Sequence, residues 1–262
     1  IPLMGSVGLK FATYSYYDPR SHGVDFEQMV NDLKSAKSDD VVLLHGCCHN
    51  PCGADLTLEQ WSILADMALE QDFTVLIDLA YQGMGSGLVE DVQGLRLIAS
   101  RLGELIVAAS CSKNLGLYRE RTGVALFFGR DTQSAAATQS HGLGAARRVY
   151  SMPPAHGALL AGRVLSDPEL RSSWERELEH VCGRMISLRR QLSEKLSAKT
   201  DQDFSFIAGE KGMFSFLGLS VEQAKGLRQT HGLYMLDSSR INVAALNADN
   251  MDKVVAAVAS AL

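Results

Sequence analysis

Short apolar runs alternate with amphipathic segments along the first two-thirds of the chain. Four runs of five or six residues are mostly aliphatic or aromatic, which is typical of strands buried in a sheet. They are VVLLH (residues 41–45), FTVLID (73–78), LIVAAS (105–110) and VALFF (124–128). Because their apolar character is nearly continuous, we expect a mainly parallel sheet that is covered on both faces.

Two helices are predicted between these runs. Thr57 followed by Gln60 is the pattern of a capping box, and the helix that it opens continues to Gln71. The apolar face of this helix consists of Trp61, Leu64, Ala65 and Ala68. A second helix is expected between Val92 and Leu102. The alternation of strands and helices indicates an α/β domain.

A much longer amphipathic pattern follows. Asp167 is a favourable N-cap residue, and Pro168 is a favourable first residue of a helix. Apolar residues then recur at spacings of three and four from Leu170 to Leu196. This predicts one helix of about 30 residues and about 45 Å, at about 1.5 Å per residue. We expect this helix to link two domains.

After this helix the pattern changes to short strands separated by two helices, which is typical of a smaller α+β domain. The strands are expected at residues 204–207, 213–217, 233–236 and 241–244. We therefore expect a large domain over residues 1–178 and a small C-terminal domain over residues 179–262.

Composition narrows the classes of function. Hydrophobic residues make up 46% of the 262 residues, charged residues 21%, and the formal net charge is −5. With no long basic run, these values argue against nucleic acid or an anionic membrane as a partner. No apolar run is long enough to span a bilayer, and no secretory leader is recognisable, so we expect a cytoplasmic protein. The chain begins at Ile1 and enters a structured pattern at once, which suggests a fragment of a longer protein.

The stretch HGCCHNPCG, residues 45–53, contains two histidines and three of the five cysteines. On a strand, His45, Cys47 and His49 would share one face. A structural zinc site usually needs a second pair of ligands, and the remaining cysteines, Cys111 and Cys182, stand alone. We therefore predict no metal site here, and expect reduced cysteines that fill a tight strand end.

Polar side chains follow three of the predicted strands, at the ends where open α/β sheets bind ligands. They are Asn50, Asp78, Tyr81, Ser110 and Lys113, with Arg121 eight residues further on. Asp78 follows a buried run, where a carboxylate is costly unless it has a partner. Lys113 at the edge of a desolvated pocket could act as a nucleophile toward carbonyls. Each residue also has a plain interpretation as a turn, a capped strand end or a solvated surface charge, but their coincidence favours a site.

The chain resembles the aspartate and aromatic amino-acid aminotransferases in three stretches, HNPCGADLTLEQW, IDLAYQGMGSG and SCSKNLGLYRERTG. The resemblance to these fold-type-I pyridoxal-phosphate (PLP) enzymes continues through RRVYSMPPAHGA, GMFSFLGLS and SSRINVAALN, and covers nearly the whole chain. It implies a PLP-transferase-like large α/β domain with a mainly parallel mixed sheet, and a smaller α+β C-terminal domain joined by a long helix. It also implies PLP-dependent transamination between an amino acid (aspartate or aromatic, with glutamate) and a 2-oxo acid such as 2-oxoglutarate.

The resemblance assigns roles to the polar residues at the strand ends. Lys113 would form the Schiff base with PLP and move the proton of the substrate, and Asp78 would pair with the pyridinium nitrogen. Asn50 and Tyr81 would hydrogen-bond the ring oxygen of PLP. The cofactor phosphate would be held by Ser110 and Arg121. By the same resemblance, His45 and His49 belong to a hydrogen-bonded shell below the cofactor.

The resemblance also implies a substrate site. Arg240 would clamp the α-carboxylate, a planar task that suits a guanidinium. Phe214 would line the pocket. Arg147 would cross the interface of a homodimer to meet a distal carboxylate, although the adjacent Arg148 makes this assignment ambiguous. The preference between aspartate and aromatic substrates does not follow from the sequence.

The chain departs from the family pattern in places. Cys52 stands where a threonine is usual, Cys111 where a bulky residue is common, and Ser239 where glycine is common. Family members also carry roughly another third of chain before the equivalent of Ile1, with an N-terminal arm, a phosphate loop, a ring that stacks on PLP and a tyrosine that reaches the neighbouring site. Two alternatives therefore stay open: a truncated, non-catalytic chain that keeps the fold as a binding or oligomerisation module, and another PLP reaction such as β-elimination or decarboxylation. The paired arginines favour transamination of dicarboxylates over the latter.

Overall fold

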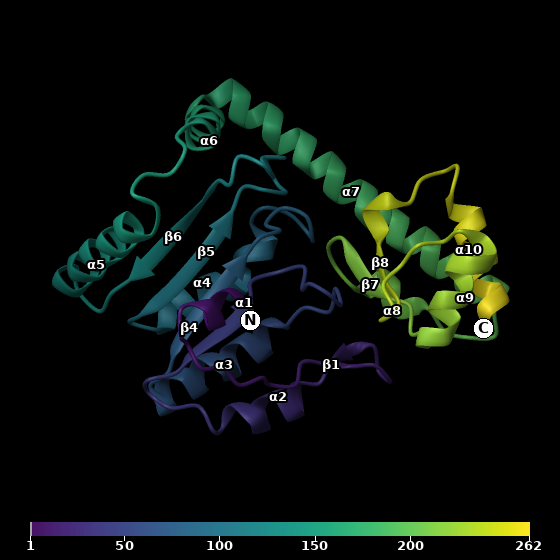
Figure 1. Ribbon diagram of the computed structural model, residues 1–262, viewed down its shortest axis with the longest axis horizontal. Coiled ribbons are helices and arrows are strands. Elements are labelled where there is room, and N and C mark those ends of the chain that lie inside the picture. The colour runs from purple at the N-terminus through teal and green to yellow at the C-terminus, as the bar shows by residue number, and fades with distance from the viewer. Residues whose placement is uncertain (1) are drawn as a thin grey trace.

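The computed structural model describes residues 2–262. Its centre is a four-stranded sheet with the order β3 (Val41–His45), β4 (Thr74–Leu79), β5 (Leu105–Ser110) and β6 (Gly123–Phe128) (Figure 1). The first three strands are parallel, and β6 pairs with β5 in the antiparallel direction. The predicted α/β class with a mainly parallel mixed sheet is confirmed.

Two predicted helices pack together beside this sheet, α3 (Leu58–Gln71) and α4 (Gln93–Arg101), the latter preceded by the short η1 (Glu90–Val92). The capping box of α3 is formed as expected: the Thr57 hydroxyl accepts the Gln60 N–H, and the Gln60 side chain accepts the Thr57 N–H. The four predicted apolar residues of α3 are all buried, and Trp61 is only 3% exposed. This face anchors the helix to the core.

The predicted long helix is α7 (Pro168–Lys199), and it crosses from the sheet-containing part to the opposite lobe of the molecule (Figure 1). Asp167 caps it by accepting the N–H groups of Glu169 and Leu170. Along α7, buried side chains join the core around the sheet as far as Met185 and a second, C-terminal core from Leu188 onward. A domain boundary after residue 178 stays a prediction.

The C-terminal lobe contains an antiparallel pair, β7 (Phe214–Phe216) and β8 (Arg240–Asn242). Around it lie α8 (Ser205–Gly209), α9 (Val221–His231), the short η2 (Val243–Ala245) and α10 (Met251–Ala261). This lobe has the predicted α+β character.

Two strands predicted in this lobe are wrong, and the other two are shorter than expected, since β7 covers only 214–216 of the run 213–217. Residues 204–207 belong to the start of α8, where Phe204 and Ile207 are both buried at a spacing of three that suits a helix and not a strand. Residues 233–236 alternate in burial as a strand would, with Met235 buried and Tyr234 80% exposed, but they lie in an irregular segment after α9 that pairs with none of the described strands. The run 241–244 leaves the strand after Asn242 and turns into η2.

The expectation of a sheet covered on both faces is also wrong for the described residues. All six residues of β6 are exposed, and in β3 the exposed Val41 and Leu43 alternate with the buried Val42 and Leu44. The inner strand β4, by contrast, has no exposed residue. Both outer strands lack a second neighbour among residues 2–262, which leaves apolar side chains uncovered.

The apolar pattern of the sequence did not predict several of the observed helices and strands. They are α1 (Pro2–Ser6), β1 (Tyr17–Asp18), β2 (Gly23–Val24), α2 (Phe26–Leu33), α5 (Thr132–Tyr150) and α6 (His156–Ser166). None of the residues of α5 is buried. Without a buried face, its sequence lacks the apolar stripe by which an amphipathic helix is predicted. Across residues 2–262, no helix has both the length and the apolar character that a membrane span requires.

Candidate active site

One cavity of about 280 Å³ lies at the carboxyl ends of β3, β4 and β5. Parallel pairing sets His45 beside Asp78, so the segments that follow these strands meet at one edge of the sheet. The cavity is lined by His45, Cys47, Asn50, Asp78, Ala80, Tyr81 and Lys113. The structure therefore brings together four residues that the sequence predicted: Asn50, Asp78, Tyr81 and Lys113.

Lys113 and Tyr81 face each other in this cavity. The Lys113 Nζ atom lies 4.6 Å from the centroid of the Tyr81 ring. Burial, and next the Asp78 carboxylate, raise the pKa of Tyr81 above its usual value, while a hydrogen bond with Asn50 opposes the shift. Tyr81 is therefore a neutral phenol at neutral pH, able to donate a hydrogen bond to a ligand next to the lysine.

The predicted substrate residues approach the same place from the C-terminal lobe. A guanidinium nitrogen of Arg240, Nη1, donates to Oδ1 of Asn50 at 3.1 Å. Arg240 also lies over the ring of Phe214, 4.7 Å from its centroid, and Phe214 meets Tyr81 edge to face at 6.4 Å. Arg240 and Phe214 border a second cavity of about 450 Å³ with mainly apolar neighbours. The contacts of Arg240 with Asn50 and of Phe214 with Tyr81 thus join the two lobes at one polar centre.

The two histidines lie beside this centre as neutral rings, tilted by 30° to each other. The rings of His45 and His49 are 4.3 Å apart, and Tyr16 stacks on His49 at 3.8 Å with an interplanar angle of 11°. Burial, and next the proximity of His45, lower the pKa of His49 to about 3, and burial lowers the pKa of His45 as well. His45 Nδ1 accepts the backbone N–H of Asn50 at 3.2 Å. These rings therefore support the residue that faces the ligand.

Two residues of this support escaped the sequence analysis. Tyr16 carries no pattern that marks it, because it lies in an irregular segment far from the strand ends. Asp55 accepts the backbone N–H groups of Cys48 and His49 at 2.7 and 2.8 Å, and so holds the end of β3 in place. Its position after the turn at residues 49–53 was visible in the sequence, but the direction of its side chain was not. The peptide bond between Asn50 and Pro51 in this turn is cis.

Three predicted residues do not line either cavity. The Ser110 hydroxyl donates to the Ser112 hydroxyl at 2.9 Å. Arg121, at a φ of 52°, donates to the carbonyl oxygen of Tyr118 at 2.8 Å. Arg147 is exposed in the last turn of α5. Their predicted roles toward a phosphate and a distal carboxylate stay predictions.

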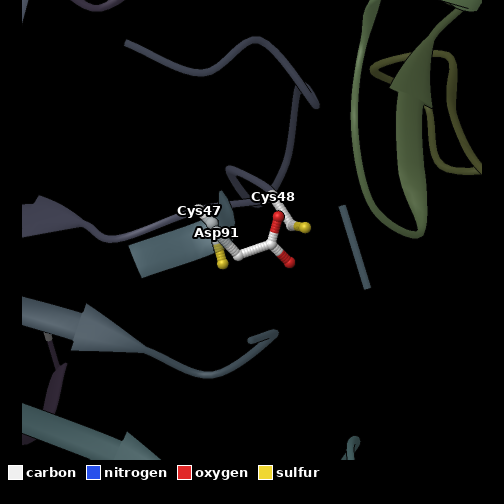
Figure 2. Close-up of side chains that lie close together, drawn as sticks. All are labelled: Cys47, Cys48 and Asp91. Carbon is white, nitrogen blue, oxygen red and sulfur yellow. The ribbon is translucent and has the colours of Figure 1, made fainter. Parts of the chain in front are cut away.

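The group of donors that lies close enough to hold a metal ion is Cys47, Cys48 and Asp91, not the trio of His45, Cys47 and His49 (Figure 2). Within the part of the chain that the structure describes, these three donor atoms are within 4.8 Å of one another and all three residues are buried. The Asp91 carboxylate already accepts three backbone N–H groups, those of Gly83, Gly85 and Ser86. Three donors are one fewer than a structural zinc site has. The contacts explain Asp91 as the residue that orders the loop after β4, and all five cysteines are free thiols.

Comparison with known proteins gives a consistent picture. Residues 3–258 match the family described as aminotransferase class I and II. The aromatic-amino-acid aminotransferase of Paracoccus denitrificans is 49% identical over 257 residues, which cover 98% of this chain and 65% of that protein. The aspartate aminotransferase of Escherichia coli (strain K12) is 44% identical over 261 residues, 99% of this chain and 66% of that protein.

Solved structures agree with these sequence relatives. An aromatic amino acid aminotransferase with 3-indolebutyric acid superimposes with a TM-score of 0.96 at 47% identity, over 99% of this chain and 66% of that one. The aromatic-amino-acid aminotransferase from Burkholderia pseudomallei, covalently bound to pyridoxal phosphate, superimposes with a TM-score of 0.98 at 37% identity, over 100% of this chain and 66% of that one. The chain thus spans about 65% of the length of the relatives that it matches.

Proposed function

We propose a function from the premise that the chain belongs to the aminotransferase class I and II family. The protein catalyses PLP-dependent transamination between an amino acid, aspartate or aromatic with glutamate, and a 2-oxo acid such as 2-oxoglutarate. The observation that carries this proposal is the convergence of Asn50, Asp78, Tyr81 and Lys113 on one cavity. Relatives named for aspartate and for aromatic amino acids support both substrate classes, and a structural neighbour bound to pyridoxal phosphate supports the cofactor.

The cavity offers the chemical groups that PLP requires. It combines an amine, a carboxylate, a phenol and an amide within about 280 Å³, close to the lower end of the volumes usual for ligand sites. When bound, PLP supplies an electron sink that stabilises negative charge on the substrate Cα. The Asp78 carboxylate would hold the proton on the pyridinium nitrogen. The Lys113 amine would bind the cofactor carbonyl and move the proton at the substrate Cα.

The neighbouring residues bind and orient. Asn50 and the neutral Tyr81 would hydrogen-bond the ring oxygen of PLP. Ser110 and Arg121 would hold the phosphate, for which a guanidinium is suited by its paired donors. Arg240 binds the α-carboxylate of the substrate, and its position over the Phe214 ring limits the directions it can take.

The assembly implied by this function is a homodimer in the cytoplasm. Arg147 is exposed and lines neither cavity of its own chain, so in this proposal it reaches a distal substrate carboxylate from one protomer into the site of its partner. Small amino acids and 2-oxo acids are the ligands in this proposal, and nucleic acids and membranes have no part in it.

The test of the proposal is an absorption spectrum of the purified chain with PLP, before and after aspartate or glutamate is added. We expect a bound-cofactor band, borohydride trapping of PLP on Lys113, and conversion of bound PLP to pyridoxamine phosphate when the amino acid is added. Succinate, which has no amino group, is the control and should cause no conversion. A spectrum of free PLP without any trapped adduct at Lys113 would refute the proposal for this chain.

A second candidate function is favoured by one observation, the coverage of about 65% of the length of the relatives. It is a non-catalytic chain that keeps the fold as a binding or oligomerisation module. The same spectrum separates the two candidates, since the module binds no PLP on Lys113. The intact mass of the native protein tests this candidate. If that mass shows the matching upstream segment joined to this chain, the reason for this candidate disappears.

Replacing Arg147 by alanine is expected to impair aspartate and glutamate selectively. A charge-assisted hydrogen bond to the distal carboxylate contributes about 1.5–3 kcal/mol, so kcat/KM for dicarboxylic substrates should fall roughly tenfold or more. Activity with an aromatic substrate should change little in the amino-acid half-reaction. The matched control is Arg148→Ala, on the next residue of the same exposed helix end. Equal losses for all substrates, or a selective loss in the Arg148 variant instead, would contradict the assignment.

A further inference from the structure

Arg189, on the C-terminal half of α7, is the largest fully enclosed side chain of the described residues, with 2% of its surface exposed. Its guanidinium donates to Glu210 Oε2 at 3.3 Å and to Ser215 Oγ at 2.7 Å. The other acceptors are backbone carbonyl oxygens, at 2.6–3.1 Å, of Ile207, Lys211, Gly212 and Phe214. One planar fork therefore binds the whole segment 207–215 to the helix. The ammonium of a lysine, with three donors and no fixed plane, cannot reproduce these bonds.

The segment 207–215 touches the turn that carries Asn50. The Lys211 N–H donates to the Gly53 carbonyl oxygen at 2.8 Å, and the Gly53 N–H donates to the His49 carbonyl oxygen at 2.7 Å. Gly53 has a φ of 78°, and a Cβ atom there would lie 2.6 Å from the Phe214 carbonyl oxygen and 3.1 Å from Arg189 Nη2. The approach of these two backbones depends on glycine, so the contact between the turn and the segment is direct and close.

The same segment also reaches Asn50 by a second route. The Phe214 carbonyl oxygen accepts a hydrogen bond from Arg189, and Arg240 lies over the Phe214 ring. Arg240 in turn donates to Asn50 Oδ1. The contacts therefore close a ring that starts and ends at Arg189. One half of this ring runs through Lys211 and Gly53, and the other half runs through Phe214 and Arg240.

We propose that Arg189 is a positioning residue for the substrate site: through the segment 207–215 it sets where Arg240 and Phe214 stand relative to Asn50. The meaning of that site rests on the proposed function, whereas the ring of contacts does not. Arg189 lines neither cavity, so it acts only through these neighbours. A displacement of about 1 Å between binding groups can lower activity by about 10²-fold. Loss of the hydrogen bonds of the Arg189 guanidinium should therefore weaken binding at the substrate site.

The first experiment asks whether Arg189 holds the contact, by a readout that needs no cofactor. In Arg189→Lys, hydrogen exchange of the Lys211 amide, which bonds to Gly53, should accelerate by about tenfold or more, while amides of α3 keep their rates. The matched control is Arg190→Lys on the neighbouring residue, which is exposed and has Glu194 at 3.9 Å as its ionic partner. Unchanged protection of the Lys211 amide in a folded Arg189→Lys protein overturns the proposal.

The second experiment asks whether the contact matters to the site. Binding of maleate, an unreactive dicarboxylate, to the PLP-loaded chain should weaken by roughly tenfold in Arg189→Lys and not in Arg190→Lys. In an Asn50→Ala background, Arg189→Lys should weaken maleate binding by less than about threefold, because the contact that Arg189 positions is already lost. Equal costs in both backgrounds would mean a general effect on the fold, and would overturn the positioning role.

The two proposals fail in different ways. If the parent chain binds neither PLP nor maleate, the proposed function is refuted, and amide exchange at Lys211 still decides whether Arg189 holds the contact. If Arg189→Lys does not fold, Ser215→Ala replaces it, since this variant removes the hydroxyl that accepts from Arg189 at 2.7 Å and changes no charge. We then expect acceleration at Lys211 of about threefold, and none at all would overturn the proposal.

Discussion

Replacing Lys113 by alanine is expected to abolish the PLP adduct that borohydride traps, and to lower the transamination rate by roughly 10⁴-fold or more. This is the upper end of the range for a group that moves a proton in the rate-limiting step, and Lys113 carries the binding of the cofactor carbonyl in addition. The other groups that line the cavity are a carboxylate, a phenol, an amide, an imidazole and a thiol, and none is an amine. The measurement combines peptide mass after reduction with single-turnover absorbance.

The control for this prediction is Lys37→Ala, a substitution of an exposed lysine that precedes the amino end of β3 and lines neither cavity. It should leave both the adduct and the rate as they are in the parent chain. An adduct that persists in the Lys113 variant on a different lysine would contradict the assignment of the nucleophile, and with it the central role of the cavity.

Replacing Glu210 by glutamine is expected to remove a pH dependence of stability worth about 3 kcal/mol. Burial raises the pKa of this carboxyl from 4.5 to about 7, and the opposing hydrogen bonds and charge of Ser215 and Arg189 do not offset it. Only 3% of the side chain is exposed, and the Oε1 atom has no partner among the described residues. The folded protein therefore favours the protonated acid, even next to an arginine, because ionising it leaves a charged oxygen without a donor.

The direction of this pH dependence follows from the Glu210 pKa, which is higher in the folded protein than in the unfolded chain. The contribution of Glu210 to stability is fully present below about pH 4.5 and is lost as the pH rises through about 7. The free energy of unfolding of Glu210→Gln, relative to that of the parent, should therefore rise by about 3 kcal/mol between about pH 4.5 and about pH 8. Urea unfolding of both proteins over this range measures it, and the contributions of His45 and His49 cancel in the difference.

Glu194→Gln serves as the control, because Glu194 is exposed and its partner Arg190 is 3.9 Å away. The difference between this variant and the parent should not depend on pH by more than about a few tenths of a kcal/mol. A trend of opposite sign in the Glu210 variant, with the parent gaining stability as the pH rises, would show that the ion pair with Arg189 outweighs the cost of burial.

Local sequence patterns were sufficient where one segment carries its own signal. The capping box at Thr57, the N-cap at Asp167 and the stripe from Leu170 to Leu196 each reflect contacts between residues three or four apart, so the predicted helices are α3 and α7 as observed. Where a short apolar run has two interpretations, the pattern failed. Residues 204–207 begin α8 because Phe204 and Ile207, three residues apart, both pack into the C-terminal core.

The candidate site shows the same division. Asn50, Asp78, Tyr81 and Lys113 could be selected from the sequence because parallel strands deliver their ends to one edge of a sheet, and all four line the cavity. The stack of Tyr16 on His49, and the bonds from Asp55 to the end of β3, join segments whose side-chain directions no local pattern specifies.

The sequence by itself determined the α/β class, the long connecting helix and the polar residues at the strand ends, because periodicity and strand-end chemistry are properties of neighbouring residues. Only the tertiary structure decided that Arg240 and Phe214 meet Asn50 and Tyr81, and that Arg189 and Glu210 lie buried behind them. These contacts join residues 21 to 190 positions apart. They depend on how α7 sets one lobe against the other, which no single segment of the chain encodes.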